Sequence, residues 1–273
     1  MGLGFWLSDA FLLTAQASVV ALPGAVVPRP LRTLATRMRG RGWALVPLAS
    51  IVAVVVAIRA ADATADGLTW LALLAVPPLA AWALAVAMRG ARPRLALLVV
   101  PLFALAWADR GGLAGEAAGV ALAGLSCVAL GVLLVAVTPW GWLRVGIVLM
   151  ALVDAILVGA DLLQPANVVL NAAAPPASLP QLQRALFGDA LIGYGDLFIA
   201  GVFGALVAAE AGAREQRRAA LLVLGLAACF DLLFLLVDVL PATVPVAAAL
   251  LLRNATPALL RCPKARRTWK SQR

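Results

Sequence analysis

The 273-residue sequence contains no histidine, only three cysteines and one tyrosine, and only 13% of its residues are charged. Histidine completes many zinc sites and the serine-protease triads, so neither of these chemistries is expected. The cysteines form no C-x-x-C pair, and we expect no metal ion and no cofactor. By contrast, 64% of the residues are hydrophobic and the mean hydropathy is +1.00. The chain is too apolar for a soluble domain and predicts a protein embedded in lipid.

Long apolar runs divide the chain and predict an all-α polytopic membrane protein of about nine transmembrane helices. The runs are 5–27, 43–59, 68–88, 95–108, 115–138, 145–163, 186–209, 219–239 and 241–259. No internal repeat and no soluble domain are evident, so residues 1–273 are expected to form a single membrane domain. This domain divides into a scaffold of five helices at 1–144, helices six to nine at 145–260, and a basic tail at 261–273.

The charges between the runs predict the orientation. The formal net charge of +9 would suggest nucleic acid in a soluble protein, but here the arginines lie in short gaps between apolar runs, so no nucleic-acid partner is expected. The basic gaps contain Arg29, Arg32, Arg37, Arg39 and Arg41; Arg89, Arg92 and Arg94; Arg144; and Arg214, Arg217 and Arg218. Nine spans with the N-terminus outside place every basic gap and the tail in the cytoplasm. We therefore predict a multi-pass cell-membrane protein, and the abundance of Ala, Gly and Arg favours a bacterial origin.

Acidic residues within the predicted spans each cost at least ~2.5–3.5 kcal/mol near a helix centre, and seven of them are candidates for a functional role. They are Glu116, Asp154, Asp161, Asp189, Asp196, Asp231 and Asp238. Glu116, Asp161, Asp189 and Asp238 lie near the ends of predicted helices, where headgroups and water can solvate them. Asp154, Asp196 and Asp231 need another explanation.

Spacing pairs these acids in two layers. Asp154 lies about ten residues before the outer end of the sixth run and Asp196 about ten after the outer start of the seventh, so both are expected ~15 Å deep. Asp161 and Asp189 form a second, shallower pair by the same arithmetic. Spacing alone does not choose between the pairs, but Gly193 and Gly195 beside Asp196 weaken the helix and admit water or a peptide backbone.

Two adjacent carboxyl groups do not ionise together easily, so one keeps a proton while the other acts as a base toward water. This is the chemistry of aspartyl proteases, which needs neither histidine, thiol nor metal. A packing face of small residues would explain the glycines equally well, but it would not explain the aspartate.

The segment 191–206, LIGYGDLFIAGVFGAL, resembles the G-x-G-D helix of presenilins and signal peptide peptidases. In that family the partner aspartate lies in the preceding span, and Val153-Asp154 is similar to its Y-D motif, with valine in place of the tyrosine. Pro241-Ala242-Thr243-Val244-Pro245 is similar to the family's P-A-L-P motif, although the second proline comes one residue late. The resemblance covers roughly residues 145–250.

The resemblance implies a presenilin-like arrangement and an intramembrane aspartyl protease with Asp154 and Asp196 as catalytic residues. It further implies that the substrate is a single-span membrane protein or a signal peptide, unwound beside the catalytic pair. Asp161 and Asp189 would tune the pair or admit water. The substrate-binding residues would be Gly193, Tyr194, Gly195, Pro241, Ala242 and Pro245.

Three other functions remain open from the sequence. Type IV prepilin peptidases also carry a G-x-G-D, but they follow it with polar residues where this chain has Leu197-Phe198-Ile199. A proton-coupled transporter would give a role to Asp231 and Asp238, which the protease leaves without one. A protein that binds membrane helices without cutting them would share the family's helix arrangement but not its catalytic activity.

Overall fold

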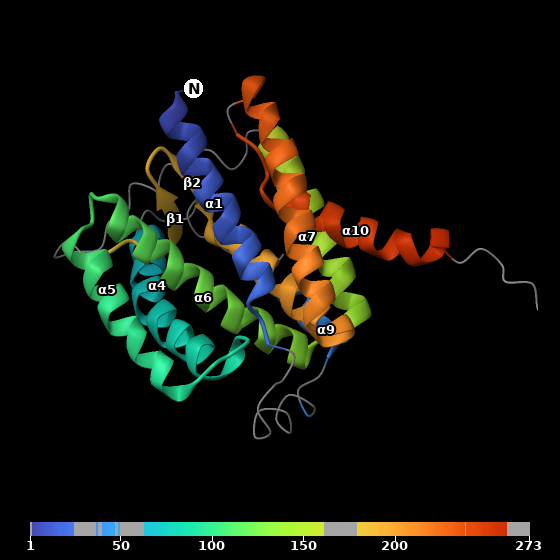
Figure 1. The fold of residues 1–273 in the computed structure, drawn as a ribbon, viewed down its shortest axis with the longest axis horizontal. Helices are drawn as coiled ribbons and strands as arrows, with labels where there is room; N and C mark the ends of the chain where they lie inside the picture. Colours follow the sequence, from blue (N-terminus) through green and yellow to red (C-terminus); the bar gives the residue numbers. More distant parts are fainter. Residues whose placement is uncertain are drawn as a thin grey trace, which may run out of the picture.

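A computed structural model of the chain describes residues 2–24, 40–46, 63–160, 179–237 and 239–260, together with Arg37 and Ala49 (Figure 1). The described part is mostly helical. The longer helices are α1 (Leu3–Ala21), α4 (Ala63–Trp82), α5 (Val99–Ala108), α6 (Leu113–Val137), α7 (Trp140–Gly159), α9 (Tyr194–Phe230) and α10 (Thr243–Leu260). Short helical segments are η1 (Arg41–Leu45), η2 (Ala83–Ala87), η3 (Pro93–Leu98) and η5 (Asp231–Leu235), and the two strands are β1 (Arg184–Phe187) and β2 (Ala190–Gly193).

Several of these helices have the length and composition of membrane spans. The segments that qualify are Leu3–Ala21, Gly67–Ala87, Leu113–Val137, Trp140–Gly159 and Tyr194–Leu235, and the shorter apolar helices are Pro93–Ala108 and Thr243–Ala255. Helices suit lipid because each one satisfies its own backbone hydrogen bonds. The predicted membrane-embedded helical protein is therefore confirmed. The predicted span at 43–59 lies largely outside the described residues.

The helices pack around α6 and α9. Helices α4 and α5 lie on α6, and α10 lies on α9. Helix α7 packs mainly on α10 and also touches α9, and α1 contacts both α6 and α9 (Figure 1). Small residues allow close contact: a methyl group added at Gly131 of α6 would lie 2.5 Å from the backbone carbon of Gly201 of α9. Helices in lipid associate through close packing of this kind.

Helix α9 contains two of the predicted spans. Gly212 interrupts it with a left-handed backbone, φ 76° and ψ −173°. Four residues later, Gln216 donates hydrogen bonds to the carbonyls of Val20 and Pro23, at the end of α1. Phe234, just beyond α9, contacts Phe5 at the other end of α1. The chain therefore reverses at Gly212, and the two halves of α9 run antiparallel.

Most of the arginine contacts lie at the end of the bundle where α9 reverses. Glu210 accepts hydrogen bonds from Arg144 of α7 at 2.7 Å and from Arg253 of α10 at 3.1 Å. Arg89 donates to the side chain of Gln216. Arg89 and Arg144 come from two different predicted gaps, and the charge pattern predicted both at the same membrane face. The grouping explains how α10 carries Arg253, because the charge is paired with a carboxylate.

The helix predicted from residue 186 is wrong at its start. Residues 184–193 form an antiparallel hairpin in which Arg184 pairs with Gly193 and Phe187 with Ala190, and Gly188 adopts a positive φ of 55° in the turn. Two short apolar runs separated by Gly-Asp are typical of such a hairpin, but an apolar run of this length is also compatible with a helix. Asp196 consequently lies in the first turn of α9, and not about ten residues into a helix.

The hairpin nevertheless brings Asp196 deep into the bundle. Most hairpin residues are buried or half-buried. Tyr194, the first residue of α9, contacts Ser126 and Cys127, which lie at the middle of the 25-residue helix α6. Extended backbone at this depth is tolerated because protein surrounds it. Asp196, two residues after Tyr194, therefore lies near the level of the middle of α6.

Candidate functional site

Asp154 lies near the end of α7, and only 8% of its surface is exposed. The hydroxyl group of Thr243, the first residue of α10, donates a hydrogen bond of 2.6 Å to its Oδ2. Thr243 is itself fully buried. A buried carboxylate needs donors of this kind, because water no longer supplies them. The contact joins α7 to the start of α10.

Asp196 accepts a hydrogen bond of 3.1 Å at Oδ2 from the backbone N–H of Gly193. This bond caps the start of α9, where backbone N–H groups lack helical partners. The carboxyl group also lies within electrostatic reach of Asp154. The structure therefore brings together the two aspartates that the sequence analysis paired.

Helices α7 and α9 present these aspartates from opposite directions. Arg144, near the start of α7, pairs with Glu210, far along the first half of α9. Asp154, near the end of α7, lies within electrostatic reach of Asp196 at the start of α9. The two helices are therefore antiparallel neighbours, as the spacing of the acids required.

Both glycines of the G-x-G-D segment lie close to this pair. A methyl group added at Gly193 would lie 2.9 Å from Oδ2 of Asp196, closer than side chains normally approach. A methyl group at Gly195 would lie 3.9 Å from Cε of Met150, one turn before Asp154 on α7. Gly193 thus leaves room for the capping carboxylate, and Gly195 faces α7.

Tyr194 turns away toward α6. Its hydroxyl group forms a hydrogen bond of 2.7 Å with Ser126, and the thiol of Cys127 donates to its carbonyl group at 3.8 Å. Tyr194, which was predicted to bind substrate, therefore anchors the start of α9 to α6.

The proline segment lies directly beside Asp154. Pro241 and Ala242 precede α10, and Pro245 lies in its first turn, where a missing N–H costs little. The Ala242 carbonyl accepts a hydrogen bond of 3.0 Å from the side chain of Gln16 on α1, which is completely buried. Sequence reasoning missed Gln16. A lone amide inside the first apolar run was the available signal.

Of the predicted second pair, Asp161 and Asp189, the structure describes only Asp189. Asp189 is exposed in the hairpin turn, where its backbone N–H donates to Ser8 at 3.4 Å. Glu116, at the start of α6, accepts a hydrogen bond of 2.7 Å from the N–H of Gly188. Asp161 and Asp238 lie outside the described residues.

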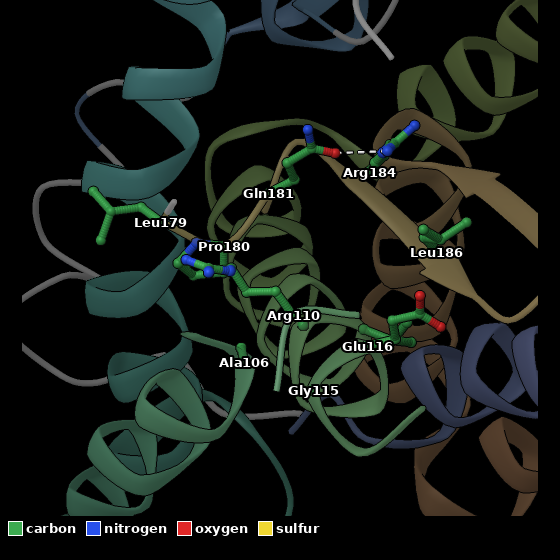
Figure 2. Close-up of a pocket in the computed structure, with 11 residues that line it drawn as sticks. Ala106, Arg110, Gly115, Glu116, Leu179, Pro180, Gln181, Arg184 and Leu186 are labelled. Atoms are coloured by element: carbon green, nitrogen blue, oxygen red, sulfur yellow. Dashed lines mark hydrogen bonds between the residues drawn. The ribbon is translucent and has the colours of Figure 1, made fainter. Parts of the chain in front are cut away.

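Two cavities lie apart from the aspartate pair. One, of about 330 Å³, lies between α5, α6 and the hairpin, and Figure 2 shows Arg110 on a different side of it from the hydrogen-bonded Gln181 and Arg184. The other, of about 350 Å³, is a groove between α1 and α6 that Leu197 also lines. Asp154 and Asp196 line neither cavity, although the groove reaches the residue after Asp196.

Within the part of the chain that the structure describes, no three His, Cys, Asp or Glu side chains gather as metal ligands would. No protein-family model matches the chain, and no curated protein and no solved structure is significantly similar to it. The chemistry of the site must therefore be argued from its own residues.

Proposed function

We propose that the protein is an intramembrane aspartyl protease that hydrolyses peptide bonds within membrane-spanning segments. The observation that carries this proposal is the proximity of Asp154 and Asp196 on antiparallel apolar helices. The resemblance of segment 191–206 to presenilins and signal peptide peptidases supports it. The same resemblance supports a presenilin-like arrangement of nine spans, and the charge pattern supports an N-terminus outside and the basic end of the bundle in the cytoplasm.

In the proposed reaction the two carboxyl groups share one proton. The ionised member removes a proton from water, which attacks the scissile carbonyl, and the protonated member donates to the carbonyl oxygen. The amine then leaves with a proton returned from the pair. Thr243 and the N–H of Gly193 hold the carboxyl groups in position through their hydrogen bonds.

The substrate must be extended before it can be cut, because a helix shields its own peptide bonds. The hairpin supports this step, since β2 runs directly into Gly193-Tyr194-Gly195-Asp196. A substrate strand that pairs with extended backbone gains hydrogen bonds to replace those of its helix. We expect single-span membrane proteins or signal peptides as substrates.

The test is a cleavage assay with the full-length protein in detergent and a panel of single-span peptides. Asp154→Asn and Asp196→Asn should abolish cleavage, and an aspartyl-protease transition-state analogue should inhibit the wild type. Glu215→Gln is the matched control, because Glu215 is a partly exposed acid whose described partner is Arg218 on its own helix. Cleavage that persists in either asparagine variant would refute the catalytic pair.

A second observation favours a different candidate, a proton-coupled transporter. Asp9 and Asp231 form another buried carboxyl pair across α1 and η5. If the wild type cuts no peptide and does not bind the analogue, transport becomes the better explanation. Proton uptake into proteoliposomes that depends on Asp231 would then support it.

A further inference from the structure

The start of α1 packs against η5, far along the sequence. Phe5 of α1 and Phe234 of η5 meet edge to face, with ring centroids 5.5 Å apart and an interplanar angle of 84°. Asp9 lies one helical turn after Phe5, and Asp231 lies one turn before Phe234. Since residues three or four apart share a helix face, both aspartates lie on the surfaces that this aromatic contact brings together.

Both aspartates are withdrawn from solvent. Asp9 is 9% exposed and Asp231 is 8% exposed. Oδ2 of Asp231 is buried and has no hydrogen-bond donor among the described residues. Its neighbour is the carboxyl group of Asp9, which lies within hydrogen-bonding reach.

We propose that Asp9 and Asp231 form a proton-binding site, in which the two carboxyl groups share a single proton. Ionised carboxylates only accept hydrogen bonds, so two of them can join only through a proton. Two buried carboxylates within hydrogen-bonding reach of each other would repel strongly, since little water screens their charges. A shared proton removes one charge and supplies the donor that Oδ2 of Asp231 lacks.

Among the residues that the structure describes, no basic side chain acts on this pair in place of the proton. Asp9 is the one ionisable side chain of α1, and Asp231 is the one of η5. At the same end of the bundle, Asp189 lies beside Gly4, and Glu116 binds the hairpin turn with Arg184 in its electrostatic reach. The arginines of α9 lie near Gly212, at the opposite end.

This site would couple to the aspartate pair through α1. Gln16 lies two turns after Asp9 and binds the carbonyl of Ala242, and the next residue, Thr243, binds Asp154. When the shared proton is lost, repulsion between Asp9 and Asp231 would loosen α1 from η5. The contact of Gln16 would loosen with it. The packing and burial of Asp9 and Asp231 define the proton site, which does not depend on the proposed protease.

The test measures protonation and stability of the purified full-length protein in detergent, from mildly acidic to mildly alkaline pH. Infrared difference spectra should show the carbonyl band of a protonated carboxyl group that disappears at high pH and is absent from Asp9→Asn and Asp231→Asn. The wild-type melting temperature should fall by several degrees over the same range, because the folded pair holds a proton that separated carboxyls release.

The asparagine variants should behave as permanently protonated, since the amide donates a hydrogen bond to the remaining carboxylate. Their melting temperatures should stay near the acidic wild-type value at all pH values, whereas Asp231→Ala should be less stable throughout. Asp189→Asn, which neutralises an exposed acid at the same end, should keep the wild-type pH dependence. Wild-type pH dependence in Asp231→Asn would overturn the proposal. If sodium stabilises the wild type at high pH, the site binds a metal cation and the proposal of a shared proton is wrong.

Discussion

Two pairs of buried carboxyl groups lie in this helix bundle, and their surroundings differ. Asp154 and Asp196 have protein donors, from Thr243 and the N–H of Gly193. Asp9 and Asp231 have an aromatic contact beside them, and Oδ2 of Asp231 has no donor among the described residues. Donors stabilise ionised carboxylates, and apolar surroundings favour protonated ones. The first pair therefore suits acid–base chemistry, and the second suits proton binding.

The backbone separates the two pairs further. Around Asp196 it changes from a buried hairpin to a helix, and two glycines leave space beside the carboxyl group. Asp9 lies within the regular helix α1. A polypeptide substrate needs extended backbone to pair with, whereas a proton needs none. Catalysis is expected at the first pair alone.

The largest expected effect is on the cleavage rate, which should fall when the first pair is substituted but not when the second pair is. Asp154→Asn or Asp196→Asn should lower the cleavage rate by roughly 10²–10⁴-fold, the usual contribution of general acid–base catalysis. Asp9→Asn and Asp231→Asn should retain cleavage, because neither side chain contacts the reacting groups. Single-turnover cleavage of a fluorescent single-span peptide measures all four. Equal losses in all four variants would contradict the division between the pairs.

A smaller loss of cleavage activity is expected when Gly193 is substituted, because this glycine leaves room for the Asp196 carboxylate. Gly193→Ala would place a methyl group 2.9 Å from Oδ2 of Asp196 and displace it from its cap. Gly193 has an extended backbone, φ −66° and ψ 146°, that alanine adopts without strain. We expect the cleavage rate to fall about tenfold, corresponding to one lost hydrogen bond of ~1–1.5 kcal/mol. Gly225→Ala, where an added methyl group meets nothing within 4 Å, is the matched control.

Substitution of Thr243 tests whether its hydrogen bond to Asp154 supports the stability and activity of the first pair. Thr243→Val keeps the shape but removes the hydroxyl, so Asp154 loses a donor and the folded protein should lose about 1–3 kcal/mol of stability. Thr243→Ser should restore both stability and the cleavage rate. Denaturation in detergent, followed alongside the cleavage assay, measures the two effects. If valine and serine behave alike, the hydrogen bond of 2.6 Å does not position Asp154.

The sequence predicted the environment and the aspartate pair better than the path of the backbone. Hydropathy predicted membrane helices, because lipid imposes the same requirement on every span. The spacing of Asp154 and Asp196 predicted that they meet, and the two carboxyl groups do lie within electrostatic reach. The hairpin at 184–193 was missed because its strands are short and apolar, and only the Gly188-Asp189 turn distinguishes them from a helix.

Contacts between distant segments could not be read from spacing. Hydropathy predicted the reversal at Gly212, because it separates the runs 186–209 and 219–239, but it did not predict that the second run would bring Asp231 to Asp9. Gln16 drew no attention, since a single amide costs far less in lipid than a charge. Its partner, the carbonyl of Ala242, is a backbone atom that every residue carries.

The smallest expected effect joins the two pairs. Gln16→Leu removes the hydrogen bond to Ala242, which lies between α1 and the segment that holds Asp154, at a cost of about 1 kcal/mol. The cleavage rate of the wild type should depend on pH in part through the titration of Asp9 and Asp231. In Gln16→Leu the cleavage rate should lose this part of its pH dependence, while the stability of the variant still falls with rising pH. Such a result would mean that the proton site acts on cleavage through α1. If Gln16→Leu keeps the full wild-type pH dependence of cleavage, the two pairs titrate independently, and the proton on Asp9 and Asp231 serves only to hold α1 against η5.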